Sequence, residues 1–258
     1  MSVSGNFEVA QAVGGRQLRH AFLNPALAIP SVIFPVVFLV AFAGGLQKVG
    51  DIPGFHFRSG YTAFQFVFVF LQSAAFGGIF TGFGVAADWE SGFVRRIFLG
   101  APQRTGIIFG YIVAAFVRWL ASSVVIWVGA LIAGMQVGGG GVDILGMIGL
   151  GFLVNATATL WGVGLAMRAK SLQAGPAMQI PVFILLFLAP VYVPLNLLEG
   201  WIHGVAGWNP ITAVLAACRG FISGVPHSTG LAYACGAGLV ALMLLWSVTG
   251  LRRAERGA

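Results

Sequence analysis

Long apolar runs separated by short polar connections constrain this chain more than any other feature. About 20 apolar residues suffice to cross the ~30 Å hydrocarbon core of a bilayer as a helix. Only 8% of the residues are charged, against roughly 25% in soluble domains, so little sequence remains for a soluble domain. Runs of spanning length occur at residues 26–46, 61–87, 107–135, 144–167, 177–198 and 231–251. The sequence therefore predicts an all-α membrane protein with six transmembrane helices.

A seventh apolar run, at residues 211–225, is too short to be counted with the others. With six spans, one side of the membrane holds Arg16, Arg19, Arg95, Arg96, Arg104, Arg168, Lys170, Arg252, Arg253 and Arg256. The other side holds only Lys48, Arg58 and Arg219. The positive-inside rule then predicts that both termini are cytoplasmic, whereas a seventh span would send the basic C-terminus outside. We therefore expect residues 199–229 to form an external, re-entrant segment before the last span.

The sequence offers no chemistry of its own. Residues 164–171 approach a phosphate-binding loop, but Ala169 replaces its second glycine and no strand precedes it. The four histidines and two cysteines are dispersed, without the spacing of metal ligands. The net charge of +7 lies in short clusters between apolar runs, which indicates membrane topology and not a nucleic-acid partner. We expect no catalytic residue, no metal and no nucleic acid.

Polar side chains inside the predicted spans are the candidates for a substrate pathway. Arg118 lies well inside the third span, where an ionisable group is costly and by default suggests function. The structural alternative is that Arg118 reaches toward the cytoplasm or pairs with Asp88 or Glu90. Gln72 and Asn155 are the other candidates, and hydrogen bonding between helices explains them equally well.

The connection between the second and third spans has the pattern of a short amphipathic helix. It starts with Asp88 and Glu90, continues with Arg95 and Arg96, and ends before Pro102. Its apolar face pairs Phe93 with Ile97, and Val94 with Phe98, at a spacing of four residues. Such a helix can lie on the membrane, dock in the groove of a partner, or serve only as a linker.

Two motifs resemble those of ATP-binding-cassette (ABC) exporters with type-2 permease domains, and the daunorubicin-resistance permeases are the nearest branch. The first is the loop pattern at Asp88, Glu90, Gly92, Leu99 and Pro102. The second is Asn209-Pro210-Ile211-Thr212 followed by Arg219, before the last helix. The resemblance in span number and loop order covers the whole chain, while the motifs cover about 30 residues.

This resemblance implies a permease subunit that pairs with a second permease copy and engages a cytoplasmic ATPase. The loop helix would be the coupling helix that enters the ATPase, formed by Asp88, Glu90, Gly92, Phe93, Arg95, Arg96, Leu99 and Pro102. Residues 1–25 would be an amphipathic segment on the membrane, and residues 26–258 the transmembrane permease domain. ATP and Mg would bind to the partner subunit, so this chain would carry no cofactor.

The resemblance also implies export of a hydrophobic or amphiphilic substrate, such as a drug, a lipid or a lipid-linked glycan, from a bacterial cytoplasmic membrane. Antibiotic resistance is one role of such exporters. Two other classes of function stay open on the residues alone. One is a membrane-embedded enzyme or scaffold that needs no ATPase, and the other is an ion-coupled carrier, which the lack of paired carboxylates inside the spans disfavours.

Overall fold

The computed structural model describes residues 3–23, 25–100 and 105–256, and these residues contain helices and connections but no strand. The α-helices are α1 (Val3–Leu23), α2 (Pro25–Gly45), α3 (Gly60–Glu90), α4 (Phe93–Gly100), α5 (Thr105–Ile132), α6 (Gly141–Ala169), α7 (Gly175–Phe187), α8 (Gly200–Trp208), α9 (Pro210–Ser223) and α10 (Thr229–Arg256). Three short 3₁₀ helices, η1 (Gln47–Asp51), η2 (Leu172–Ala174) and η3 (Leu195–Leu197), lie in connections. The predicted all-α membrane fold is confirmed.

Four described helices, α3, α5, α6 and α10, are long and apolar enough to cross a membrane, and counting α8 with α9 as one bent span gives five. The predicted spans at residues 26–46 and 177–198 correspond to α2 and α7. Helix α7 stops at Phe187, because Pro190 and Pro194 in the following segment cannot continue a helix. The count of six spans therefore stays a prediction.

Helix α3 is the centre of the bundle and packs against α2, α5, α6 and α9. In its most apolar stretch, 89% of the residues are buried by the rest of the chain. Gly78 and Gly82 allow α6 to approach closely, because a Cβ at Gly78 would lie 2.7 Å from the Cβ of Ala158 and one at Gly82 would lie 2.7 Å from the Cα of Gly162. Small residues four apart make this close contact possible without a hydrophobic driving force between helices.

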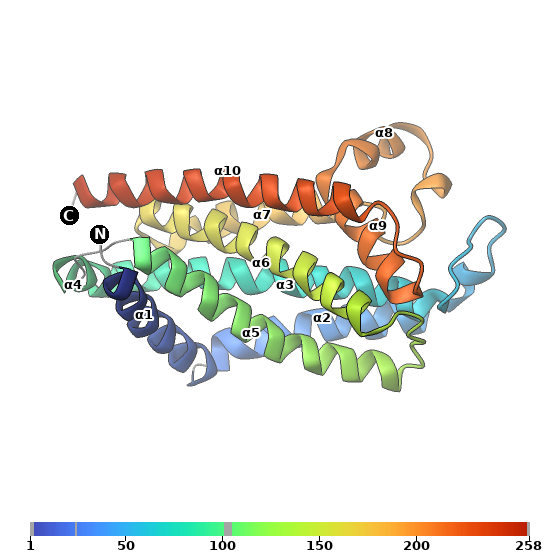
Figure 1. Cartoon of the computed structure of the whole chain (residues 1–258), viewed down its shortest axis with the longest axis horizontal. Coiled ribbons are helices and arrows are strands. Elements are labelled where there is room, and N and C mark those ends of the chain that lie inside the picture. The colour runs from blue at the N-terminus through green and yellow to red at the C-terminus, as the bar shows by residue number, and fades with distance from the viewer. Residues whose placement is uncertain (1–2, 24, 101–104, 257–258) are drawn as a thin grey trace.

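Helix α1 packs along α5 (Figure 1). Its buried positions are Ala10, Val13, Gly14 and Gln17, the spacing of one helix face. A Cβ at Gly110 of α5 would lie 2.7 Å from the carbonyl oxygen of Ala10, so glycine brings the two helices together. The N-terminal segment is thus a helix packed on the bundle along one face, where Ala10 and Gly14 make the closest approach to α5.

The bundle has two different ends (Figure 1). Both chain termini and α4 lie at one end, which we call the α4 end, and α8 and η1 lie at the other, which we call the α8 end. At the α8 end, α8 and α9 meet at a bend of 81°. A bend of this size belongs either to a broken span or to a re-entrant segment, so the predicted re-entrant segment stays a prediction.

Candidate functional site at the α4 end

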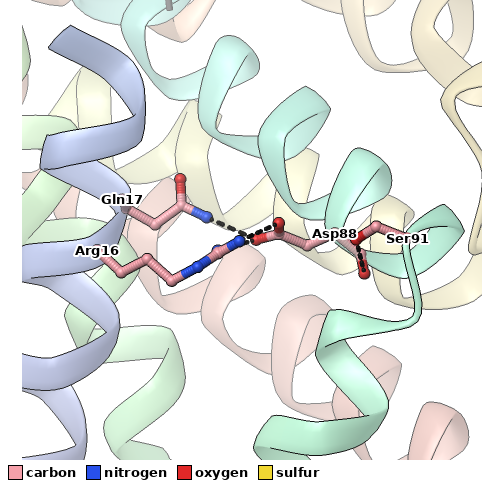
Figure 2. A network of polar contacts seen from close by, with 4 residues as sticks. All are labelled: Arg16, Gln17, Asp88 and Ser91. Atoms are coloured by element: carbon pink, nitrogen blue, oxygen red, sulfur yellow. Dashed lines mark hydrogen bonds and ion pairs between the residues drawn. The ribbon is translucent and has the colours of Figure 1, made fainter. Parts of the chain in front are cut away.

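Asp88, in the last turn of α3, is held by α1 (Figure 2). Arg16 Nη1 donates to Asp88 Oδ2 at 2.7 Å and Arg16 Nη2 donates to Asp88 Oδ1 at 3.0 Å, a bidentate ion pair. Gln17 Nε2 donates to Asp88 Oδ2 at 3.1 Å. A buried carboxylate near a helix C-terminus is unfavourable by itself, and these three donors compensate it. The ion pair therefore fixes α1 to the end of α3.

Glu90 holds the opposite side of the same helix end. Its Oε1 accepts hydrogen bonds from Ser171 Oγ and from the Leu172 N–H, each at 2.8 Å. Residues two apart on an α-helix point about 200° apart around its axis. Asp88 therefore faces α1 while Glu90 faces the connection between α6 and α7. The acidic motif joins three separate parts of the chain at one helix end.

A turn at Gly92 separates this helix end from α4. Gly92 has φ +73, in the left-handed region that favours glycine, and α4 begins at the next residue. The single amphipathic helix predicted from Asp88 onward is therefore wrong. Asp88 and Glu90 belong to the C-terminus of α3, because the left-handed Gly92 ends that helix before α4 starts.

Helix α4 turns its apolar face to the bundle. Val94 and Phe98 are buried, as their spacing predicts, and the Phe98 ring meets the Trp89 ring edge to face at 5.6 Å between centroids. Phe93 is half-buried, with the Arg16 guanidinium 3.5 Å from its ring centroid. Arg96 is exposed. The same arginine thus contacts both the end of α3 and the start of α4.

Some coupling positions predicted from the sequence lie outside the described part of the structure. They are the side chains of Arg95 and Leu99, and the whole of Pro102. Their proposed roles stay predictions.

The intramembrane polar residues point to α3. Arg118 of α5 is buried and donates to the carbonyl oxygen of Gly77 and, at 2.8 Å, to Thr81 Oγ1. Asn155 Nδ2 of α6 donates to the carbonyl oxygen of Ala74 at 2.8 Å. The expected pairing of Arg118 with Asp88 or Glu90 is wrong, because both carboxylates are bound elsewhere. Arg118 and Asn155 instead attach α5 and α6 to neighbouring carbonyls of α3.

Gln72, the third intramembrane candidate, differs from these two. It is fully buried in α3, and neither amide atom has a hydrogen-bond partner among the described residues. A buried amide without partners costs free energy, so Gln72 marks a position in α3 whose hydrogen-bonding capacity the described contacts leave unused.

The second motif lies at the α8 end and fixes α9. Asn209 Oδ1 accepts from the Ile211 N–H at 2.9 Å, which caps α9, and Asn209 Nδ2 donates to the carbonyl oxygen of Leu185 at 2.7 Å. Pro210 follows at the first helical position, where its missing N–H costs nothing. The hydroxyl of Thr212 is buried without a partner among the described residues. The Asn-Pro pair therefore defines the start of α9 and its link to α7.

Arg219 of α9 is buried among backbone carbonyls. It donates to the carbonyl oxygens of Pro190 at 2.8 Å, Val191 at 3.0 Å and Phe64 at 3.4 Å. Its guanidinium lies 3.3 Å from the centroid of the Phe64 ring. Arg219 thus binds the non-helical segment after α7 and the start of α3.

Sequence reasoning missed the partners of the acidic motif. Arg16 was interpreted as a topology charge within the N-terminal amphipathic segment, Ser171 only as the end of a stretch that approaches a phosphate-binding loop, and Gln17 was not singled out. The one available signal was charge: a carboxylate at the end of an apolar helix needs a cation, and the N-terminal segment supplies two arginines before the first span. The sequence could not show that Arg16 and not Arg19 is the partner of Asp88, because that depends on how α1 packs on α5.

The described helices include several that are long and apolar enough to cross a membrane, which defines a multi-pass membrane protein. The end of α3 is tied to α1 by Asp88 and to the α6–α7 connection by Glu90, and we call these contacts the joint. The sequence matches the family described as ABC-2 type transporter over residues 8–222. The chain belongs to this family, and it is a permease component of an ABC transporter, which implies a partner ATPase. A comparison with curated proteins found no match.

Proposed function

We propose that this chain is the membrane subunit of an ATP-driven exporter that moves a hydrophobic or amphiphilic substrate out of the cytoplasm. In this proposal the α4 end faces the cytoplasm, where both termini and most of the arginines lie. A second permease copy completes the pathway, and the partner ATPase binds ATP and Mg and hydrolyses ATP. The chain itself carries out no covalent chemistry.

The joint formed by Asp88 and Glu90 carries this proposal. A force applied to α4 reaches α3 through the turn at Gly92, and the two carboxylates pass it to α1 and to the connection between α6 and α7. Because α3 is packed against most of the bundle, a shift of its end can change packing between two states of the whole domain. Because the end of α3 is attached on two sides, a movement of α4 would be transmitted both to α1 and to the α6–α7 connection.

The composition of the described spans supports an apolar substrate. The described helices bury one cluster of aliphatic and aromatic side chains that includes residues of α3, α5, α6 and α7. The phenylalanines at positions 64, 66, 68, 70 and 76 of α3 are buried inside the chain, so they stabilise the bundle and do not themselves line a pathway. A drug, a lipid and a lipid-linked glycan all fit this proposal.

Co-purification with the partner tests the class of function. The chain should bring along an ATPase subunit, and reconstituted vesicles should show ATP-dependent export of a fluorescent amphiphile. Glu90→Gln and Arg96→Glu should each lower transport without preventing insertion in the membrane. The matched control is Arg252→Gln, an exposed arginine of α10 that lies outside the joint.

The alternatives predict other results. If no ATPase accompanies the chain and the variants at Glu90 and Arg96 keep full activity, the exporter proposal fails in favour of an enzyme or scaffold. Transport that follows an ion gradient in the absence of ATP would show an ion-coupled carrier instead.

A further inference from the structure

A cavity of about 180 Å³ lies in the apolar part of the bundle, away from the joint at the α4 end. Helix α7 contributes one wall and α10 the other, over a floor made by α3 and α6, with α9 closing the α8 end. Representative lining residues are Val182 and Leu185 of α7, Ala158 and Trp161 of α6, and Leu239 and Met243 of α10. The polar groups of the lining are bonded within the bundle: the indole N–H of Trp161 donates to the carbonyl oxygen of Met178 at 3.0 Å, and Thr157 Oγ1 donates to the carbonyl oxygen of Leu153 at 2.8 Å.

The cavity opens toward the surroundings of the bundle. Helix α7 packs on α3 and α6, whereas α10 packs on α6 and α9, so the space between α7 and α10 is left unfilled. Leu239 and Met243 on its rim are only partly buried, and Pro181 is exposed. For a membrane protein, the surroundings of these spans are lipid chains. An apolar cavity of roughly this size stays free of water and takes up an apolar ligand.

A cation lies next to the cavity on the side of the α4 end. The Trp161 ring, which lines the cavity, stacks on the Trp246 ring at 5.4 Å between centroids, and the Arg168 guanidinium lies 3.5 Å from the Trp246 ring centroid. Arg168 lies seven positions after Trp161 in α6, a rise of about 10 Å. The apolar cavity and the charge are therefore adjacent along the helix axis.

The charge of Arg168 is not neutralised by a carboxylate in the described structure. Its hydrogen bonds go to the carbonyl oxygens of Gly164 at 2.6 Å and Trp246 at 2.8 Å, and to Thr249 Oγ1 at 2.7 Å. Arg168 is only half-buried, and the positive charge of Arg253, in the last turn of α10, acts on it from nearby. Two positive charges at the edge of the membrane attract an anionic headgroup.

We propose that the cavity between α7 and α10 binds one acyl chain of an anionic phospholipid of the bilayer, and that Arg168 binds its phosphate. The volume is large enough for a segment of a single alkyl chain. The site has the same order as a phospholipid: the apolar cavity would hold the acyl chain, and Arg168, beyond the stacked Trp161 and Trp246, would hold the phosphate. This site lies apart from the joint at Asp88 and Glu90, so it does not depend on how the ATPase is coupled.

The headgroup half of the proposal is tested by native mass spectrometry of the purified full-length chain with dioleoyl phosphatidylglycerol. We expect one bound lipid per chain, with phosphatidylglycerol preferred over phosphatidylcholine of the same chains. Arg168→Gln should weaken phosphatidylglycerol binding about fivefold, while Arg168→Lys should keep most of it. The control Arg252→Gln removes an exposed arginine of the same region and should bind as the wild type does. An equal loss in the control would show general surface attraction and overturn the proposal.

The acyl-chain half is tested by filling the cavity. Leu239→Trp places a large ring in the cavity and should lower phosphatidylglycerol binding, whereas Leu242→Trp, on the exposed face of the same helix, should not. Thermal unfolding in detergent checks that both variants fold. In the wild type, a phosphatidylglycerol with a diazirine in one acyl chain should label α7 and α10 at the rim. Labelling spread evenly over the exposed faces of α2 and α5, or full binding by a folded Leu239→Trp variant, would overturn the proposal.

Discussion

The Arg16–Asp88 ion pair at the α4 end and Arg219 at the α8 end hold their charges in different ways. At the α4 end, the side chains of Arg16 and Asp88 form an ion pair between α1 and α3. Glu90 accepts hydrogen bonds from the Ser171 hydroxyl and the Leu172 backbone N–H. At the α8 end, Arg219 binds three backbone carbonyls and an aromatic ring, and no carboxylate is among its partners in the described structure. Each of these contacts can separate by a rotamer change, but Arg219 is buried whereas the Arg16 side chain is 37% exposed, so water replaces the Arg16 contacts at a lower cost in free energy. We infer that the Arg219 contacts at the α8 end resist local opening more than the Arg16–Asp88 contact at the α4 end does.

Loss of the Arg219 contacts should have the largest effect on stability. In Arg219→Leu, the carbonyls of Phe64, Pro190 and Val191 lose a buried donor, and we expect a loss of about 3 kcal/mol in the free energy of unfolding. Unfolding of the purified variant in detergent measures this value. The control Arg58→Leu, an exposed arginine between η1 and α3, should be neutral. If the variant is fully stable but inactive, Arg219 acts in the transport pathway and does not anchor the α8 end.

Breaking the ion pair at the α4 end should have an intermediate effect on stability and a larger one on transport. Asp88→Asn leaves Arg16 without its charged partner and should cost about 2 kcal/mol. Combined with Arg16→Gln in a double-mutant cycle, the stability measurements should show a coupling of about 1 kcal/mol, because Arg16 is partly exposed. Arg19→Gln, which removes an exposed arginine of α1, serves as the control. A coupling of zero would show that α1 is held only by its packing on α5.

Removing the cap of α9 should have the smallest effect. Asn209→Ala loses the acceptor for the Ile211 N–H and the donor to Leu185, and we expect about 1 kcal/mol of destabilisation. Asn209→Asp keeps the cap but loses the amide donor, so it should lie between the wild type and the alanine variant. If both variants are equally unstable, the bond to α7, and not the cap, is what Asn209 contributes.

The sequence was most informative where hydrophobicity decides the structure. The predicted spans at residues 61–87 and 144–167 lie within α3 and α6, because the apolar run and the helix are set by the same bilayer thickness. The start of α9 coincides with a local signal, an Asn before a Pro, although the sequence interpretation used that pair only as a motif of the resemblance. These features depend on residues that are close together along the chain.

Contacts between distant residues were not predictable in the same way. Asp88 and Arg16 are 72 positions apart, and nothing in either local pattern selects the other. Arg118 shows the same limit: its depth in the span was clear, but its partners are a carbonyl and Thr81 of a helix whose rotation only the packed bundle fixes. The end of α3 at Gly92 had a visible turn signal in Ser91-Gly92, yet the amphipathic pattern that crosses it favoured one continuous helix.

The enclosure of α3 by its own chain has a consequence for the assembled transporter. Because α3 is surrounded by other helices of its own chain, it makes few contacts with lipid. The packing of α3 should therefore vary little with the composition of the bilayer. A second permease copy would likewise be separated from α3 by neighbouring helices. Any passage between two copies would be bordered by those outer helices. Helix α3 would act on the substrate only by shifting the helices that surround it.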